Sequence, residues 1–217
     1  MNWYQYTDDK GNKSVIWQKG DDDNVTINGQ PYEDIGETYT QQINASTSIT
    51  FTQNEVTSIT TSTMTKDEWV SQYSKDDWNG TPANKACNKA SDAMLANDGV
   101  KSSGMTIIVN NAGNGRAGSA NGNADKAITD MSNAIDQNVP TKVNVDYKPG
   151  SGGSADKMGD HFVVVEGKTE AVKNGQVTST TFRYFDPGTS NQNKGTSPSN
   201  TLSVMNRTLV GDNISVH

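Results

Sequence analysis

Short apolar segments separated by polar turns fill the first part of the chain, a pattern typical of β-strands. An aromatic run at the start is followed by a polar turn at 8–12, and an apolar run at 14–17 by an acidic turn at 20–24. Over 47–63, Thr and Ser alternate with Ile, Phe and Val, as in a pair of half-exposed strands. We therefore predict a small β-rich module over residues 1–60, whose first strands form a β-meander.

Helical periodicity begins after this module. Residues 65–68 have the Thr-x-x-Glu sequence of a capping box, and the apolar residues that follow fit a helix over 66–76. A second helix is predicted over 84–96, with Cys87 in its first turn. The third, over 124–138, has the apolar spacing of an amphipathic helix and ends before a proline.

Strands are predicted between and after these helices, at 105–109, 143–147, 161–166 and 181–185. The run at 161–166 is apolar on both faces, which indicates a central strand, and Asn174-Gly175 is a strong signal for a hairpin turn that pairs it with 181–185. Residues 110–123 are nearly all Asn, Gly, Ala or Ser, and we expect them to form a mobile rim. The region 61–217 is thus predicted to be an α+β domain.

Composition narrows the classes of function. Hydrophobic residues make up 31% of the 217 residues and charged residues 20%, so that Asn, Thr, Ser and 20 glycines fill the balance, as in a chain rich in strands and loops. The net charge of −7, without a cluster of Lys or Arg, argues against a nucleic-acid partner. No apolar run approaches the ~18 residues of a membrane helix, so we expect no membrane span. The N-terminal sequence also lacks the basic and apolar regions of a secretory signal peptide.

Few cysteines and histidines are available in this chain to hold a metal ion. The single cysteine excludes an internal disulfide and a multi-cysteine zinc site, and the two histidines leave little for a His-based site. Asp21–Asp23 matches part of a calcium loop, but the remaining ligands of such a loop are missing, so a solvated turn is the better interpretation. We therefore expect no metal and no cofactor.

Cys87 lies in the first turn of a predicted helix. A lone cysteine is more often a small buried apolar residue. At a helix N-terminus, however, unpaired backbone N–H groups and the helix dipole favour the thiolate, which is the reactive form of the side chain. The same N–H groups can stabilise an oxyanion. Cys87 is therefore the candidate nucleophile.

His161 opens the predicted central strand, and the hairpin register places a carboxylate beside it. If the turn closes at Asn174-Gly175, Val163 faces Asp186, so that His161 and Asp186 are diagonal neighbours on one face. A carboxylate there can fix the tautomer and orientation of a catalytic imidazole. The alternatives are a structural histidine and an ordinary turn at Asp186. Asp160 is the competing carboxylate, but it points to the opposite face of a regular strand.

Three segments resemble papain-like cysteine peptidases of the bacteriocin-processing, C39-like type, in the form associated with toxins and effectors of Bacteroidetes. They are a helix–strand unit at 134–147, the His-containing strand Gly159–Gly167, and Tyr184–Gly188 with its Asp-Pro pair. The resemblance covers about residues 80–190 and implies a papain-like fold, in which a helix carrying Cys87 packs on an antiparallel sheet carrying His161 and Asp186. In that family the three matching residues form the catalytic triad.

The chain departs from this family at the nucleophile. The family usually has Cys-Gly-Pro there, whereas this chain has Cys87-Asn88-Lys89. The family often has a glutamine a few residues upstream as an oxyanion donor, and this chain has none at that place. Asn84 is the nearby amide, and we predict it as the oxyanion-binding side chain, together with the backbone N–H of Cys87.

These features predict a cysteine hydrolase that cleaves an amide bond. The favoured substrate is a peptidoglycan stem peptide, cut by an amidase or endopeptidase that serves as a secreted antibacterial effector. Such an effector is made in the bacterial cytoplasm, leaves it without a signal peptide, acts in the periplasm or cell wall of a target cell, and has a cognate immunity protein as a possible partner. The alternatives are a C39-like protein-processing peptidase and a catalytically inactive papain-like binding module.

Overall fold

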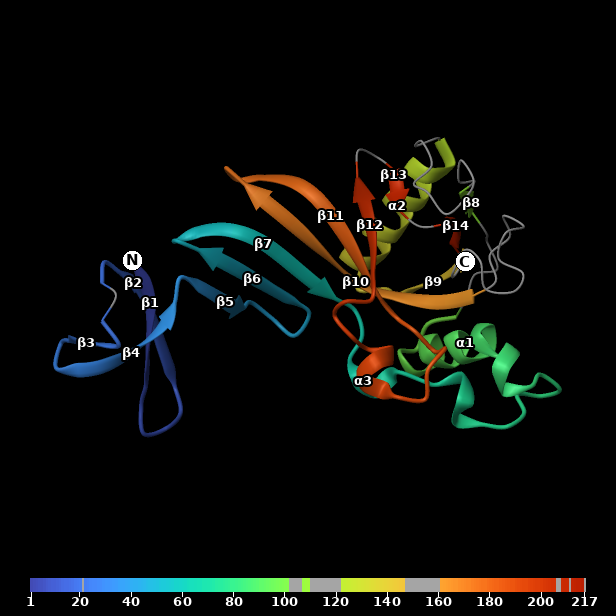
Figure 1. The fold of residues 1–217 in the computed structure, drawn as a ribbon, viewed down its shortest axis with the longest axis horizontal. Helices are drawn as coiled ribbons and strands as arrows, with labels where there is room; N and C mark the ends of the chain where they lie inside the picture. Colours follow the sequence, from blue (N-terminus) through green and yellow to red (C-terminus); the bar gives the residue numbers. More distant parts are fainter. Residues whose placement is uncertain are drawn as a thin grey trace. The chain divides into compact units, whose positions relative to one another are not determined.

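The computed structural model describes residues 1–20, 22–101, 107–109, 122–146, 161–205, 208–210 and 212–216. The chain divides into two compact units (Figure 1). One comprises residues 1–60 with 171–178, and the other comprises residues 61–170 with 179–217. No helix among the described residues is long and apolar enough to cross a membrane.

The first unit begins with a four-stranded antiparallel sheet. Its strands are β1 (Asn2–Thr7), β2 (Lys13–Gln18), β3 (Asn24–Ile27) and β4 (Gln30–Gly36), in the order β2-β1-β4-β3. The predicted β-meander is wrong, because a meander would place β1 at an edge, whereas β1 pairs with both β2 and β4. The interior position of β1 fits its buried aromatic residues, since Trp3 is 8% exposed and Tyr4 is fully buried.

Three further strands follow in the first part of the chain: β5 (Thr38–Gln42), β6 (Thr47–Thr52) and β7 (Glu55–Ser62). The strand pair predicted over 47–63 is confirmed by β6 and β7, which are neighbours in a sheet. The ring of Trp3 lies 5.2 Å from that of Tyr39 and 5.7 Å from that of Phe51. These aromatic contacts join the four-stranded sheet to β5 and β6 within the first unit.

The larger sheet is organised around the long strand β10 (His161–Lys173), with β11 (Gln176–Phe185) as its hairpin partner. The hairpin predicted at Asn174-Gly175 is confirmed, and its two residues have φ angles of 53° and 74°, as a type I′ turn requires. The other neighbours of β10 are β9 (Thr141–Asp146) and β7.

The remaining strands extend this sheet at its ends. They are β12 (Thr201–Met205), β13 (Thr208–Val210), β8 (Ile107–Val109) and β14 (Asp212–Val216). Strand β12 lies between β11 and β13, and β14 pairs with both β8 and β9.

Helices cover both faces of β10. The helices of the second unit are α1 (Cys87–Asn97), α2 (Gly122–Asp136) and the short α3 (Gln192–Gly195). Helix α2 packs on the face that carries Val163 and Val165, whereas Met94 and Leu95 of α1 pack with Val164 on the opposite face. All three valines are completely buried. The prediction of a strand that is apolar on both faces is therefore confirmed, and α1 lies against an antiparallel sheet.

The segment before α1 differs from its prediction. The helix expected over 66–76 is wrong, because two separate 3₁₀ turns, η1 (Lys66–Glu68) and η2 (Gln72–Ser74), occupy this region. The backbone N–H of Gln72 donates to the carbonyl of Pro187 at 2.9 Å and so has no helical partner. Tertiary hydrogen bonds thus override the local helical periodicity.

Other predicted elements are shifted or lie outside the described residues. The helices expected at 84–96 and 124–138 are found as α1 and α2, and the turn η3 (Ala83–Lys85) precedes α1. The rim expected over 110–123 lies outside the described residues, except for the first two residues of α2. Asp21 of the acidic turn also lies outside them.

The core beneath α2 is expected to dominate the stability of the second unit. Phe182 of β11 is fully buried in this core. We expect Phe182→Ala to lower the free energy of unfolding by about 3–5 kcal/mol, because it removes buried apolar area and leaves a cavity. Val177→Ala on the same strand, where Val177 is 52% exposed, is the control and should change that free energy by less than about 0.5 kcal/mol. Urea unfolding measures both, and equal effects would contradict the assigned core.

Candidate active site

Cys87 is the first residue of α1. The N-cap residue, Ala86, is fully buried and has no side-chain acceptor for the first N–H groups of the helix. The N–H groups of the first turn therefore receive no hydrogen bond from a capping side chain. They lie at the end of the helix where the helix dipole also favours negative charge. Cys87 is half-buried, and the backbone N–H groups of Asn88 and Phe162 are among the groups that lower its pKa. The helix start thus provides donors for a thiolate.

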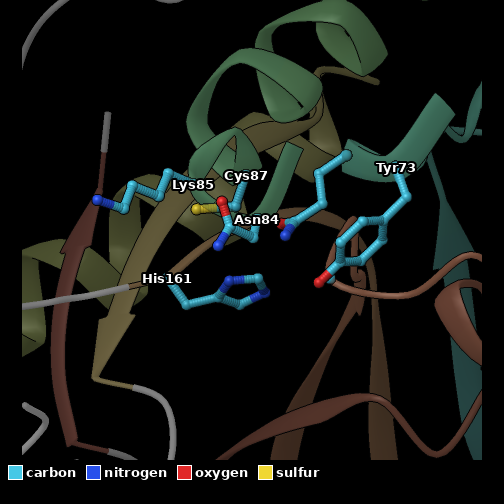
Figure 2. Close-up of a pocket in the computed structure, with 7 residues that line it drawn as sticks. Tyr73, Asn84, Lys85, Cys87 and His161 are labelled. Atoms are coloured by element: carbon cyan, nitrogen blue, oxygen red, sulfur yellow. The ribbon is translucent and has the colours of Figure 1, made fainter. Parts of the chain in front are cut away.

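His161 is the first residue of β10 and lines the same cavity as Cys87 (Figure 2). Its pairing with Val145 of β9 fixes the backbone. The imidazole Nε2 lies 2.7 Å from Oδ1 of Asp186. Because Nε2 faces Asp186, Nδ1 is the ring nitrogen left for the sulfur. Only 12% of the His161 side chain is exposed, so the imidazole is held largely away from water.

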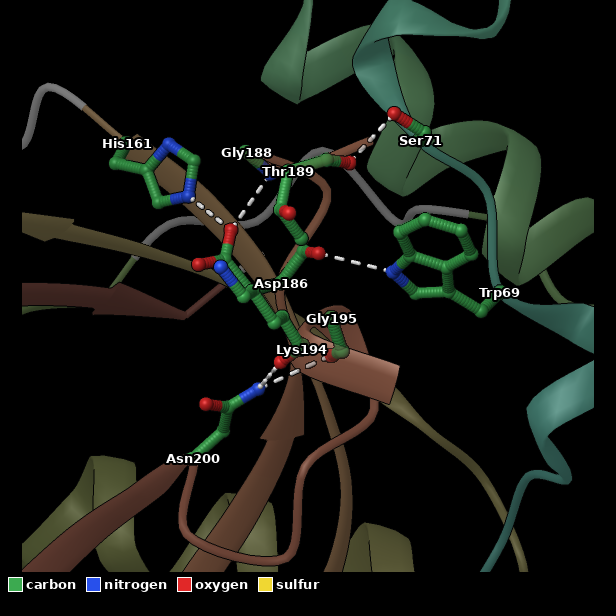
Figure 3. Close-up of polar contacts among 9 residues, drawn as sticks. All are labelled: Trp69, Ser71, His161, Asp186, Gly188, Thr189, Lys194, Gly195 and Asn200. Carbon is green, nitrogen blue, oxygen red and sulfur yellow. Dashed lines mark hydrogen bonds and ion pairs between the residues drawn. The ribbon is translucent and has the colours of Figure 1, made fainter. Parts of the chain in front are cut away.

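Asp186 directly follows β11, and the hairpin brings its carboxylate to His161, as the register argument predicts. Its Oδ1 also accepts the backbone N–H of Gly188 at 2.7 Å (Figure 3). A Cβ at Gly188 would lie 2.9 Å from both Asp186 Oδ1 and His161 Cε1, so this close approach requires glycine. Asp160, the competing carboxylate, lies outside the described residues.

Cys87 and His161 shift each other's pKa. Burial raises the pKa of Cys87, but the hydrogen bond and charge of His161, with the N–H donors of Phe162 and Asn88, bring it below its ordinary value. Burial lowers the pKa of His161, but the hydrogen bonds and negative charges of Asp186 and Cys87 raise it to about 9. Each charged group stabilises the other, so both pKa shifts act in favour of a thiolate–imidazolium pair.

The charge on His161 can be measured directly. We expect its ring Cε1–H resonance to titrate with a midpoint near pH 9. Cys87→Ala should move the midpoint to lower pH, because it removes the hydrogen bond and the negative charge of the thiolate. The background variant His217→Gln leaves His161 as the single histidine of the chain. A midpoint near the ordinary value of about 6.5 with Cys87 present would contradict the ion pair.

A cavity of about 330 Å³ opens at the Cys87–His161 pair. It is lined by Gln72, Tyr73, Asn84, Lys85, Cys87, His161 and Gly188 (Figure 2). Lys85 brings a positive charge to this lining, in which no described residue carries a carboxylate. The described part of the chain has no group of three or more His, Cys, Asp or Glu placed to hold a metal ion. The site thus combines a nucleophile, a proton-transfer group and space for part of a substrate.

Asn84, the predicted oxyanion-binding side chain, lines the cavity, and so do two residues that the sequence did not indicate, the amide Gln72 and its neighbour Tyr73. Gln72 is 5% exposed, and its Oε1 has no hydrogen-bond partner among the described residues. A buried amide normally has its polar atoms satisfied, so this exception points to a role in the cavity. The sequence feature that could have indicated Gln72 is its place as a polar amide among the apolar and aromatic residues of 69–73.

Comparisons with known proteins do not assign a function to this chain, so the assignment rests on the geometry of the site. No protein-family model, curated protein or solved structure matches the chain.

Proposed function

We propose that this chain is a cysteine hydrolase that cleaves an amide bond, with Cys87 as nucleophile, His161 as general base and acid, and Asp186 as the orienting carboxylate. The observation that carries the proposal is the grouping of three side chains: Cys87 and His161 line one cavity, and Asp186 Oδ1 lies 2.7 Å from Nε2 of His161. The opposed pKa shifts of Cys87 and His161 support it, because an activated nucleophile and its base need such shifts.

A papain-like fold for residues 61–217 is part of the same proposal. It is supported by a helix that begins at the candidate nucleophile and packs on an antiparallel sheet. The imidazole stands at the start of one strand of that sheet, and the carboxylate follows the end of the neighbouring strand. This order of helix, histidine strand and acidic residue is the one that the sequence resemblance implies.

Acylation starts from the thiolate–imidazolium pair. The Cys87 sulfur attacks the carbonyl carbon of the amide and forms a C–S bond, and the carbonyl oxygen becomes an oxyanion. The first-turn N–H groups of α1 and the side-chain amide of Asn84 or Gln72 stabilise that charge. His161 gives its proton to the leaving nitrogen as the C–N bond breaks, which leaves a thioester on Cys87 and a neutral imidazole.

Deacylation uses the same groups in reverse. Neutral His161 takes a proton from water as the water oxygen attacks the thioester carbon, and the C–S bond then breaks to release the acid and restore the thiolate. Asp186 stabilises the imidazolium at both ends of the cycle. By holding Nε2, it also keeps Nδ1 directed at the sulfur and the reacting water.

The proposed substrate is a peptidoglycan stem peptide, cut by an antibacterial effector in the periplasm or cell wall of a target cell, with a cognate immunity protein as partner. Lys85 supports this choice, because stem peptides carry free carboxylates and Lys85 is the cation of a cavity lining without described carboxylates. The alternatives remain a C39-like protein-processing peptidase and an inactive papain-like binding module.

Digestion of purified peptidoglycan sacculi, followed by mass spectrometry of the released fragments, tests this substrate. We expect stem-peptide fragments with a new amine and a new carboxylate, and none with Cys87→Ala. Cleavage of peptide leaders without release of sacculus fragments would favour the processing peptidase. No turnover of either substrate, together with slow labelling of Cys87 by a thiol probe, would favour the inactive binding module and overturn the hydrolase.

A further inference from the structure

Hydrogen bonds join two segments that are far apart in the sequence and meet beside His161 and Asp186. Residues 65–74, the entry segment, precede α1, and residues 186–195, the Asp186 loop, follow β11. Three donors of the entry segment bond to carbonyls of this loop. Trp69 Nε1 donates to Asp186 at 2.9 Å and Ser71 Oγ to Thr189 at 2.6 Å (Figure 3). The N–H of Gln72 donates to Pro187 at 2.9 Å. The entry segment therefore holds the loop that carries the candidate triad carboxylate.

Both backbone polar groups of Asp186 belong to this network. Its N–H donates to the carbonyl of Gly195 at 2.8 Å, and its carbonyl accepts the indole N–H of Trp69. A Cβ at Gly195 would overlap the indole ring, so Trp69 lies directly against the backbone of Gly195. The Gly195 carbonyl is also bonded by Asn200 Nδ2 at 3.1 Å (Figure 3). Trp69 thus contacts both ends of the Asp186 loop.

We propose that Trp69 is a positioning residue, whose indole N–H fixes the backbone of Asp186 so that the carboxylate meets Nε2 of His161. The inference rests on the proposed function only for its kinetic consequence, because the bond between Asp186 and His161 is a feature of the fold. The entry segment also places Gln72 and Tyr73 in the cavity lining. The entry segment therefore holds the loop of Asp186 and also contributes two residues to the lining of the cavity at Cys87.

Trp69 also has an apolar role, which the test has to separate from its hydrogen bond. The ring packs against a buried cluster formed by Met64, Met94, Leu95, Val164 and Phe185. Trp69→Phe keeps an aromatic ring in this cluster and removes the N–H donor. Trp17→Phe in β2 makes the same replacement outside the network and is the matched control.

The titration of His161, in the His217→Gln background, reports the position of Asp186. The charged groups that face His161 among the described residues are Asp186 after β11 and Cys87 of α1, and Lys85 of η3 shares the cavity. Without the Trp69 donor the Asp186 carbonyl loses a hydrogen bond, the carboxylate is held less firmly against Nε2, and its attraction for the imidazolium weakens. We expect the midpoint in Trp69→Phe to fall by about one pH unit, and kcat on a confirmed substrate to fall about tenfold to a hundredfold with KM nearly unchanged.

The same His161 midpoint in Trp69→Phe and in Trp17→Phe would overturn the inference. The titration needs no substrate, so a protein that hydrolyses nothing would remove the proposed function and leave this test in place. If circular dichroism shows that Trp69→Phe does not fold, Ser71→Ala decides, because it removes the bond to Thr189 from the same loop. A lower midpoint in Ser71→Ala would then support the positioning role, and an unchanged midpoint would overturn it.

Discussion

Replacing Cys87 by alanine is expected to abolish hydrolysis while leaving the fold nearly unchanged. The sequence has one cysteine, so no other thiol can take over the attack on the substrate. The rate should fall by several orders of magnitude, because no covalent intermediate can form. The fold should persist, since alanine has the highest helix propensity and the sulfur is half-buried at the start of α1.

The rate on a confirmed substrate and the circular dichroism spectrum together measure this effect. Ser91→Ala is the matched control, because Ser91 lies in the same helix, is fully buried, and has an Oγ without a partner among the described residues. It should keep nearly full activity. Full activity in Cys87→Ala would show that Cys87 is not the nucleophile.

Asp186→Asn is expected to produce the second large loss, a fall in kcat of about 10⁴, the size measured for the corresponding change in a Ser-His-Asp triad. Asparagine keeps the shape of the side chain but removes the charge that stabilises the imidazolium. The His161 pKa should fall below about 9. Because the attacking form needs a protonated His161, the alkaline limb of the rate should move to lower pH in this variant.

Asp160→Asn provides the comparison for this result. The hairpin register places Asp186, not Asp160, beside His161. In the structure Asp186 Oδ1 lies 2.7 Å from Nε2 of His161, as this register requires. Steady-state kinetics of both variants across the pH range should show a much smaller loss for Asp160→Asn. A larger loss in Asp160→Asn than in Asp186→Asn would contradict the assignment of the third residue.

The central hairpin could be predicted because its signals are local. Asn174-Gly175 specifies a two-residue turn, and this turn fixes the register that carries Asp186 to His161. The run of valines beginning at Val163 has no polar position, so it can only lie in a strand that is covered on both faces. The candidate nucleophile and base were also accessible from the sequence, because it offers one cysteine and two histidines.

The entry segment could not be predicted because its structure depends on residues more than a hundred positions away. The capping box at Thr65 and Glu68 does form, but it begins a single 3₁₀ turn. The helix then ends, because Trp69 and Gln72 bond to the Asp186 loop. These tertiary hydrogen bonds place Gln72 in the lining of the cavity, and no local sequence pattern predicts them. The pairing of β1 with β4 was missed for the same reason, since it joins two hairpins that are each locally complete.

The activation of Cys87 by His161 is the central claim, and the rate of alkylation by iodoacetamide as a function of pH tests it most directly. Because His161 lowers the pKa of Cys87, the rate near pH 6 should be higher than that of an ordinary cysteine. In His161→Ala, the rate at that pH should fall and then rise about tenfold per pH unit up to the ordinary thiol pKa of about 8.5. A tenfold rise per unit through pH 8 in the unaltered protein, identical to that of His161→Ala, would show an ordinary cysteine and contradict the claim.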